Sequence, residues 1–222
     1  MRFDYALVLS RLPDVFNALG VTVGIWVVSL IGATLIGFVV AIGRRYGPRW
    51  LNWVLGAYVE IFRGTPFLIQ LFLLYFGGPY AGLSLDAIPA GVLALSVYGA
   101  AYFSEIFRAG FEAVPVGHVE AAECAGFSRG QIVTRILLPE MTMLALPPAV
   151  NMAISLLKDT AVMSVITVPE LTLTISALGT EFYAFIESLF LLALCYWGLT
   201  EICAAAGRYS EKKLSRFRFA SS

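Results

Sequence analysis

Long stretches of hydrophobic residues, separated by short polar segments, dominate this sequence. No charged residue occurs between Asp14 and Arg44, a run of 29 residues, whereas about 20 suffice to cross a bilayer as a helix. A secretory signal peptide would have a shorter apolar core of about 7–15 residues and a small-residue cleavage site, so we expect a retained span over about 17–43. The same pattern predicts four further spans, at about 51–76, 88–110, 140–165 and 181–206.

The composition is that of a membrane protein and excludes several other classes. Hydrophobic residues make up 59% of the 222 residues and charged residues 14%, against roughly 45–50% and about 25% in soluble domains. These values exclude a disordered, fibrous or nucleic-acid-binding protein. Three cysteines and one histidine provide neither a zinc-ligand spacing nor a disulfide framework. We therefore expect a single all-α transmembrane domain over residues 1–222, with no bound metal.

The basic residues indicate how the five predicted helices are oriented. The 15 basic and 15 acidic side chains cancel, but the basic ones are unevenly placed. The N-terminus and the loops on its side carry two of them, Arg2 and Arg11, and the opposite side carries eleven. Because cytoplasmic loops are enriched in Lys and Arg, we expect the N-terminus outside and the C-terminus in the cytoplasm. The eleven are Arg44, Arg45, Arg49, Arg108, Arg129, Arg135, Arg208, Lys212, Lys213, Arg216 and Arg218.

The segment 111–139 is the largest predicted cytoplasmic loop and has a helical pattern of its own. A helix-compatible stretch over 118–125 ends at Gly126, the residue type that best tolerates a left-handed helix C-terminus. Ser128 begins a second helix, with Gln131 at the position that a capping box requires. Acidic and small residues alternate on the first helix, which gives a surface that another protein can approach closely. The alternative is an ordinary amphipathic connector.

Several motifs resemble one family of transport proteins. Glu120-Ala121-Ala122, then Gly126, then Ile136-x-Leu138-Pro139 after nine residues resemble the EAA loop of ABC-importer permeases. Three further segments are similar to sequences of the polar-amino-acid branch of this family, whose members transport histidine, glutamine, glutamate, arginine and opines. These segments are YFSEIFRAGFEAVPVGHVEAA, EIFRGTPFLIQLFLLYFG and SLLKDTAVMSVI. The resemblance covers about residues 15–210 and implies the type I ABC importer transmembrane fold.

The resemblance also implies how the protein works. In this family the loop forms a coupling helix, here 117–126, that sits in a groove of a separate ATPase subunit. The chain has no Gly-x-x-x-x-Gly-Lys-Ser/Thr segment to cradle ATP phosphates, so ATP and Mg²⁺ would bind to that partner and this chain would be non-catalytic. The ATPase-coupling residues would be Gly117, His118, Glu120, Ala121, Ala122, Glu123 and Gly126. Lone His118 is expected to make contacts and not to catalyse.

The expected assembly has several components. An odd number of spans leaves no room for two inverted halves, so a solute path needs a second permease subunit, identical or a sister chain. The resemblance adds an ATPase dimer on the cytoplasmic side and an extracytoplasmic substrate-binding protein. It implies a multi-pass protein of the cell inner membrane that imports a polar amino acid or an opine-like compound by alternating access.

Two charged residues fall within the second predicted span. Glu60 and Arg63 would lie near the midplane, where ionisable groups are costly and need a partner or a function. Their i,i+3 spacing lets them neutralise each other. The alternative is a substrate pocket in which Arg63 binds an α-carboxylate and Glu60 an ammonium group. Because Pro66 lacks an N–H, the backbone is expected to unwind beside Thr65, as at transporter binding sites, and Gln70 would face the same path.

The fourth span contributes a second polar group. Lys158 and Asp159 are adjacent and so face different partners; Lys158 can snorkel to the outer interface, whereas Asp159 is too short and is the better pocket residue. Lys158 and Thr160 are candidate gate or pocket residues. Pro147-Pro148 predicts a kink in the same span. Glu105 is expected to be solvated near a cytoplasmic end.

Two other classes of function compete with the importer hypothesis. An ion-coupled secondary transporter could use intramembrane acids to carry protons, but it leaves the loop and the missing second half unexplained. A membrane-embedded enzyme is disfavoured because no His, Asp and Glu residues have catalytic spacing. Copurification with an ATPase would distinguish the importer from the secondary transporter.

Overall fold

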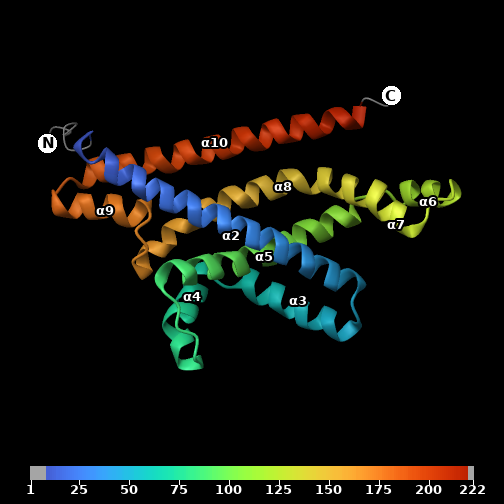
Figure 1. The fold of residues 1–222 in the computed structure, drawn as a ribbon, viewed down its shortest axis with the longest axis horizontal. Coiled ribbons are helices and arrows are strands. Elements are labelled where there is room, and N and C mark those ends of the chain that lie inside the picture. Colours follow the sequence, from blue (N-terminus) through green and yellow to red (C-terminus); the bar gives the residue numbers. More distant parts are fainter. Residues whose placement is uncertain (1–8, 220–222) are drawn as a thin grey trace.

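The computed structural model describes residues 9–219, and the side chains of residues 9–213. Helices form all of the regular structure in this part, which confirms the all-α prediction (Figure 1). They are α2 (Leu12–Tyr46), α3 (Arg49–Gly64), α4 (Phe67–Phe72), η1 (Leu73–Gly77), η2 (Gly78–Ala81), α5 (Ala87–Glu112), α6 (Val116–Cys124), α7 (Arg129–Ile132), η3 (Val133–Leu137), α8 (Leu138–Asp159), η4 (Thr160–Ile166), α9 (Leu171–Glu181) and α10 (Phe185–Phe219). Arg2 and the side chains of Arg216 and Arg218, used above for orientation, lie outside the described residues.

Within the described residues, four helical segments are long and apolar enough to cross a membrane. They are Leu12–Tyr46, Ala87–Glu112, Arg129–Ile166 and Phe185–Lys213. A fifth crossing exists if the bent pair Arg49–Gly64 and Phe67–Ala81, whose halves meet at 110°, is one span. Each of the five predicted spans has a counterpart among these segments. The number of crossings and the side on which each terminus lies remain predictions.

The last third of the chain differs from the prediction at one boundary. The segment 166–180 was expected to be a loop, but Leu171–Glu181 form the separate helix α9, and the last long helix begins at Phe185 instead of near 181. The α9 segment has only 11 residues, about half of what a helix needs to cross a bilayer, so a search for spans by length left it in the loop. At the expected kink, α8 continues through Pro147 and Pro148 without a break.

The start of α9 is fixed by a buried carboxylate that is not recognisable from the sequence alone. Glu170 is fully buried and accepts hydrogen bonds from the backbone N–H groups of Thr172 and Leu173, both at 2.8 Å, and from the Tyr196 hydroxyl at 3.0 Å. Thr22 of α2 accepts a bond from the next amide, that of Leu171, at 3.1 Å. Glu170 lies between the candidate spans. Burial raises the pKa of its carboxyl group, while the hydrogen bonds that it accepts from Thr172, Leu173 and Tyr196 lower that pKa. The cap thus ties α9 to α2 and α10.

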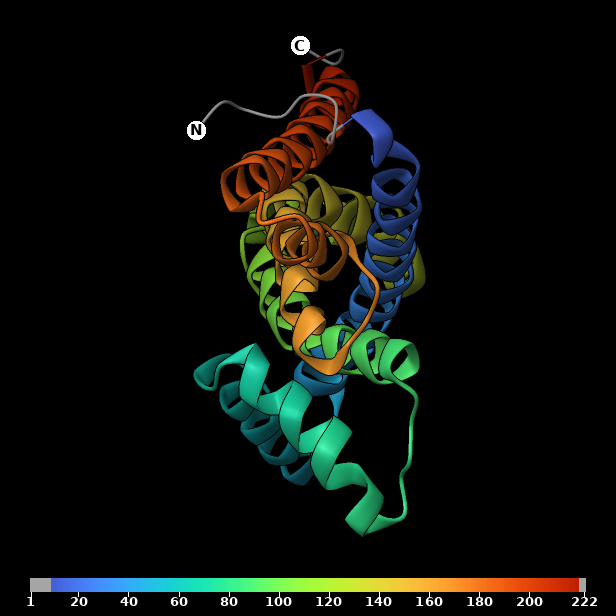
Figure 2. The ribbon, with the colours of Figure 1, turned by 90° about the vertical axis from the view of Figure 1, so that its left-hand side faces the viewer.

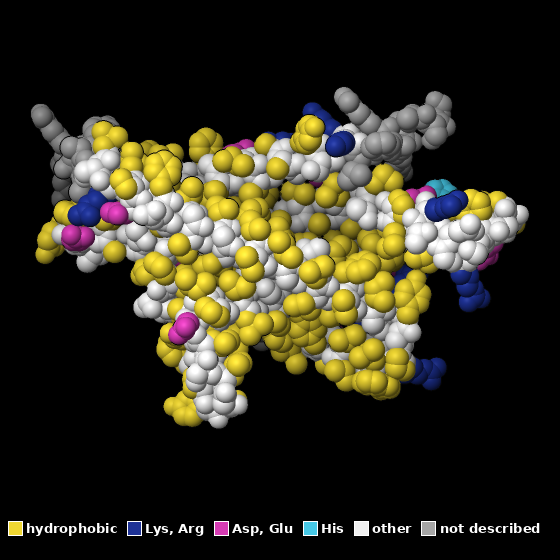
Figure 3. Space-filling model, in the orientation of Figure 1, with side chains coloured by type: hydrophobic (Ala, Val, Ile, Leu, Met, Phe, Trp, Pro, Cys, Tyr) yellow, Lys and Arg dark blue, Asp and Glu magenta, His cyan; other side chains and the backbone are white. Residues whose placement is uncertain are grey.

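The centre of the molecule is formed by α2 lying along α5, with α8 packed against α5 (Figures 1 and 2). Leu95, Leu156 and Met163 are fully buried at this centre. The helices α3 and α4 lie on one side, away from α9 and α10 (Figure 2). On the face seen in Figure 3, hydrophobic side chains cover the middle and charged ones gather mostly toward the ends, which is the surface expected of a protein in a bilayer.

Small residues allow α2 and α5 to approach closely. A Cβ at Gly37 of α2 would lie 2.7 Å from the Cβ of Phe103, whereas a Cβ at Gly24 of the same helix would meet nothing within 4 Å. We expect Gly37→Ala to lower the stability of the purified protein by about 1–3 kcal/mol because the two helices must separate. Gly24→Ala is the matched control and is expected to be neutral or stabilising by up to about 1 kcal/mol, since alanine favours helix. Thermal unfolding midpoints in detergent measure both, and equal midpoints would contradict the packing argument.

Candidate functional site

The second predicted span is interrupted where the sequence predicted unwinding. The helix α3 ends at Gly64, and Thr65 and Pro66 are extended, with φ/ψ of −120°/146° and −63°/138°. The carbonyl of Phe62, which lost its helical partner to Pro66, accepts a hydrogen bond from Nε2 of Gln70 at 2.9 Å. The break is therefore confirmed, and a side chain satisfies the backbone group that it frees.

Gln70 and Thr65 are both engaged at this break. Nε2 of Gln70 also donates to the carbonyl of Thr65 at 3.1 Å and to its Oγ1 at 2.8 Å, and Thr65 Oγ1 donates to the carbonyl of Ile61 at 2.8 Å. Oε1 of Gln70 is buried and has no hydrogen-bond partner among the described residues. Gln70 thus stabilises the break through its amide nitrogen, and contact of either residue with a substrate remains a prediction.

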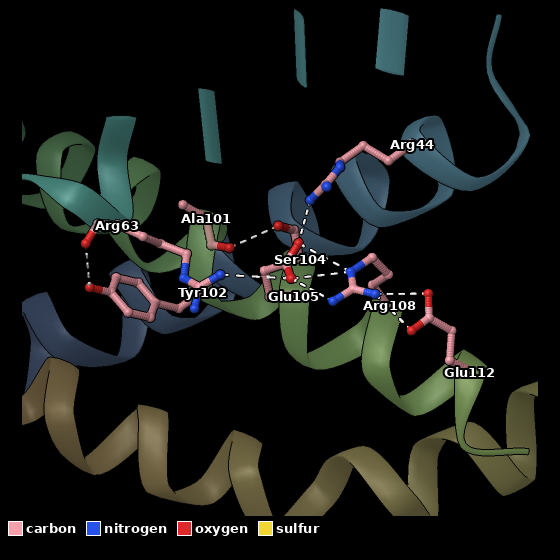
Figure 4. Close-up of polar contacts among 8 residues, drawn as sticks. All are labelled: Arg44, Arg63, Ala101, Tyr102, Ser104, Glu105, Arg108 and Glu112. Atoms are coloured by element: carbon pink, nitrogen blue, oxygen red, sulfur yellow. Dashed lines mark hydrogen bonds and ion pairs between the residues drawn. The ribbon is translucent and has the colours of Figure 1, made fainter. Parts of the chain in front are cut away.

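Arg63, at the end of α3, does not pair with Glu60. Glu60 is exposed, and the acid that faces the Arg63 guanidinium is Glu105 of α5, with Nη1 and Oε2 3.7 Å apart (Figure 4). The guanidinium also lies over the ring of Tyr102, 5.4 Å from its centroid. The proposed neutralisation of Arg63 by Glu60 is therefore wrong, and Glu60 is left available for another partner.

Glu105 is the centre of a charged cluster, and the expectation that it is solvated is wrong. Its side chain is only 19% exposed and forms ion pairs with Arg63, Arg44 and Arg108 (Figure 4). Arg108 is held at 2.8 Å and extends the cluster to Glu112 at 2.7 Å. The Glu105, Arg108 and Glu112 spacing on one helix face was visible in the sequence, whereas the contact with Arg44, 61 positions away, was not.

The polar residues of the fourth predicted span lie where α8 changes into η4. Lys158 is exposed, Asp159 is half-buried, and Thr160 is fully buried with its hydroxyl donating to the carbonyl of Leu157 at 2.6 Å. The Asp159 carboxylate forms no hydrogen bond or ion pair with any described residue. The neighbouring Lys158 and Tyr98 act on it electrostatically without forming an ion pair or a hydrogen bond with it. The carboxylate therefore keeps its hydrogen-bonding capacity for a cationic group.

Two tyrosines of α5 lie between Arg63 and Asp159, the two charged residues of the candidate pocket. The hydroxyl of Tyr98 donates to that of Tyr102 at 3.3 Å, and the ring of Tyr102 lies under Arg63. The order Arg63, Tyr102, Tyr98, Asp159 therefore places a cation at one end of an aromatic pair and a carboxylate at the other. The two tyrosines could not be identified from the sequence, because an aromatic i,i+4 pair on an apolar helix is indistinguishable from ordinary core packing.

The helix α6 projects from one end of the molecule, beyond α7 (Figure 1). Gly126 follows it with φ +79°, and Ser128 forms both bonds of its capping box with Gln131 at 2.8 and 3.4 Å. These local predictions are confirmed. His118 contacts Glu140 of α8, with Nδ1 and Oε2 2.8 Å apart.

Most of the predicted coupling residues face outward. Ala122 is buried against this chain, and the others are exposed. The exposed ones are Gly117, His118, Glu120, Ala121, Glu123 and Gly126. An exposed face of this kind permits docking of a partner, but does not identify one.

Comparisons with known proteins agree on one family. The family model described as "Binding-protein-dependent transport system inner membrane component" matches residues 33–216. The probable amino-acid ABC transporter permease protein YckA of Bacillus subtilis (strain 168) is 34% identical over 215 residues, covering 97% of this chain and 95% of that protein. The arginine transport system permease protein ArtQ of the same strain is also 34% identical, over 96% of this chain and 98% of its own length.

Solved structures have the same arrangement of helices. A chain from the crystal structure of an amino acid ABC transporter with histidines has a TM-score of 0.89 and 29% identity, covering 96% of this chain and 100% of its own. A chain of the inward-facing MetNI methionine ABC transporter has a TM-score of 0.76 at 22% identity, covering 92% of this chain and 98% of its own. The latter likeness supports the fold alone.

Proposed function

Because this chain belongs to the family of binding-protein-dependent transport system inner membrane components, we infer that it is the permease subunit of an ATP-driven amino-acid importer. The observation that carries this conclusion is the family match over residues 33–216, which includes the broken span, the candidate pocket and α6. The named relatives are amino-acid permeases, and the fold is that of importer membrane subunits.

The finer proposal concerns the substrate, a polar amino acid or an opine-like compound. Its α-carboxylate binds Arg63, since a guanidinium fork matches a carboxylate, and its ammonium group binds Asp159, whose carboxylate lacks an ion pair among the described residues. Glu60 is a second acid for a cationic group, and Thr65 and Gln70 line the path beside the helix break. Lys158 and Thr160 border Asp159 at the gate.

We further propose the assembly in which this pocket operates. The exposed face of α6 and the turn at Gly126 dock on an ATPase dimer, which binds ATP and Mg²⁺, so closure of that dimer tilts the attached helices. A second permease subunit completes the path, and an extracytoplasmic binding protein delivers the substrate. In the inner membrane, with five spans and a cytoplasmic C-terminus, alternating access then imports the substrate.

The test is reconstitution of this chain with its ATPase and binding protein in proteoliposomes. Individual amino acids are screened for stimulation of ATP hydrolysis and for uptake. ATP-dependent uptake of one polar amino acid is expected. Uptake by this chain alone, driven by a proton gradient and independent of ATP, would instead identify a secondary transporter.

Asp159→Asn provides a sharper test of the pocket. The amide keeps the size of the side chain but loses the charge that pairs with the ammonium group, and hydrogen bonds to charged groups contribute about 1.5–3 kcal/mol. We expect the substrate concentration for half-maximal uptake to rise about tenfold or more. Asp86→Asn is the control, because Asp86 is an exposed carboxylate before α5 with no capping bond. An unchanged concentration for Asp159→Asn would remove Asp159 from the pocket.

A further inference from the structure

The three arginines around Glu105 are not held equally. Arg108 donates from Nη2 to Oε2 at 2.8 Å and from Nε to the same oxygen at 3.1 Å, and Arg44 donates from Nη1 to Oε1. Arg63 is the most distant, at 3.7 Å, and its side chain is 43% exposed, against 21% for Arg44 and 38% for Arg108. Arg63 is therefore the partner that can leave this carboxylate most easily.

The charges of the cluster also leave Arg63 undercompensated. Three guanidinium groups share two carboxylates, because Glu112 pairs with Arg108 alone and Glu105 pairs with all three (Figure 4). The cluster therefore has one positive charge in excess. Arg63 is the least neutralised of the three arginines, because its ion pair with Glu105 is the longest. A second anion can bind there without displacing the two closer ion pairs.

We propose that Glu105 is a positioning residue that competes with the substrate for Arg63. With the pocket empty, the Glu105 carboxylate acts as the internal counter-anion of Arg63 and keeps it over Tyr102. When an α-carboxylate arrives, Arg63 turns from Glu105 to the substrate, and Glu105 remains with Arg44 and Arg108. This proposal rests on the function proposed above, in that it assumes Arg63 as the carboxylate ligand.

The exchange of Glu105 for the substrate at Arg63 also affects contacts outside the pocket. Arg44 lies in the last turn of α2 and Arg108 in the end of α5 that leads to α6, so Glu105 joins the broken span to both helix ends. Release of Arg63 removes the ion pair between the end of α3 and this cluster, while Glu105 keeps its pairs with Arg44 of α2 and Arg108 of α5. Occupancy of the pocket thus changes how the end of α3 is held against α2 and α5.

Glu105→Gln tests the competition in the reconstituted complex. The substitution keeps the side-chain size and removes the competing charge, while the Tyr102 ring still positions Arg63. Because partly exposed ion pairs contribute up to about 1 kcal/mol, we expect the substrate concentration for half-maximal ATPase stimulation to fall about two- to fivefold. Glu112→Gln is the matched control: it removes a carboxylate from the same helix and from Arg108 but does not touch Arg63, and should leave that concentration unchanged.

A double substitution separates competition from a merely structural role. If Glu105 acts through Arg63, Glu105→Gln has no effect on half-saturation in an Arg63→Gln background, measured at raised substrate concentrations. An equal effect in both backgrounds, no shift, or a shift to weaker binding would overturn the proposal. If Glu105→Gln does not assemble, Glu105→Asp replaces it, because aspartate keeps the charge but reaches less far toward Arg63. The substrate concentration for half-maximal stimulation is again expected to fall, and an unchanged or higher concentration would overturn the proposal. If the unmodified complex shows no ATP-dependent uptake of any amino acid, that result contradicts the proposed function and not the competition for Arg63.

Discussion

Arg63→Ala is expected to abolish amino-acid uptake while the membrane complex still assembles. The side chain is 43% exposed, and its ion pair with Glu105 is the longest in the cluster, so its removal costs little packing or folding energy. The substrate carboxylate then loses its guanidinium partner, and hydrogen bonds to charged groups contribute about 1.5–3 kcal/mol each, so loss of a two-bond fork corresponds to a loss of affinity of roughly a hundredfold or more. Uptake of labelled amino acid into proteoliposomes measures the loss, and size-exclusion chromatography of the purified complex measures assembly.

Two further variants define what the Arg63 result means. Arg63→Lys keeps the charge but loses the planar fork, so we expect intermediate uptake. Arg45→Gln also removes one arginine, but Arg45 is exposed at the end of α2 and contacts Tyr46 and Phe111 instead of Glu105, so uptake should remain normal. Normal transport by Arg63→Ala would show that the carboxylate of the substrate binds elsewhere.

The broken span shows what a sequence can predict about such a site and where it fails. Pro66 lacks an N–H, which made the interruption predictable from covalent chemistry alone. The partner of the freed Phe62 carbonyl, Gln70, lies eight residues away, close enough to be suspected but not assigned. Arg63 and Glu60 illustrate the failure: their i,i+3 spacing permits pairing, but Glu105 of another helix provides the acid that Arg63 contacts.

Contacts between distant segments explain the remaining errors. Glu105 was expected to be solvated because its distance from Arg44 in sequence conceals that α2 lies along α5. Glu170 was overlooked for the same reason, since its partner Tyr196 belongs to α10 and its burial depends on packing against α2. Helical periodicity reports which face of a helix is apolar, and not which helix covers it. By contrast, the turn after α6 depends on neighbouring residues, and its conformation was predicted correctly.

Substitution in this turn, Gly126→Val, is expected to uncouple ATP hydrolysis from amino-acid uptake. Gly126 has φ +79°, a conformation that is strained for a β-branched residue, although a Cβ there would meet nothing within 4 Å. The strain of about 1–3 kcal/mol acts on the two bonds that close the turn, from the amide of Gly126 to the carbonyl of Glu123 and from the amide of Phe127 to the carbonyl of Ala122, both at 3.0 Å. We expect α6 to lose its fixed angle to α7, so that ATP is hydrolysed without the matching helix movement.

The expected result is a fall of about tenfold or more in amino acid imported per ATP hydrolysed, with membrane insertion and basal ATPase activity retained. Gly130→Val is the matched control, because Gly130 is also exposed and free of contacts within 4 Å but lies in α7 without a positive φ. Parallel assays of phosphate release and of uptake in proteoliposomes give the ratio for each variant. Because the two substitutions add the same side chain to open space, a difference between them isolates the backbone conformation at Gly126. An unchanged ratio for Gly126→Val would mean that the angle of α6 does not transmit the work of the ATPase.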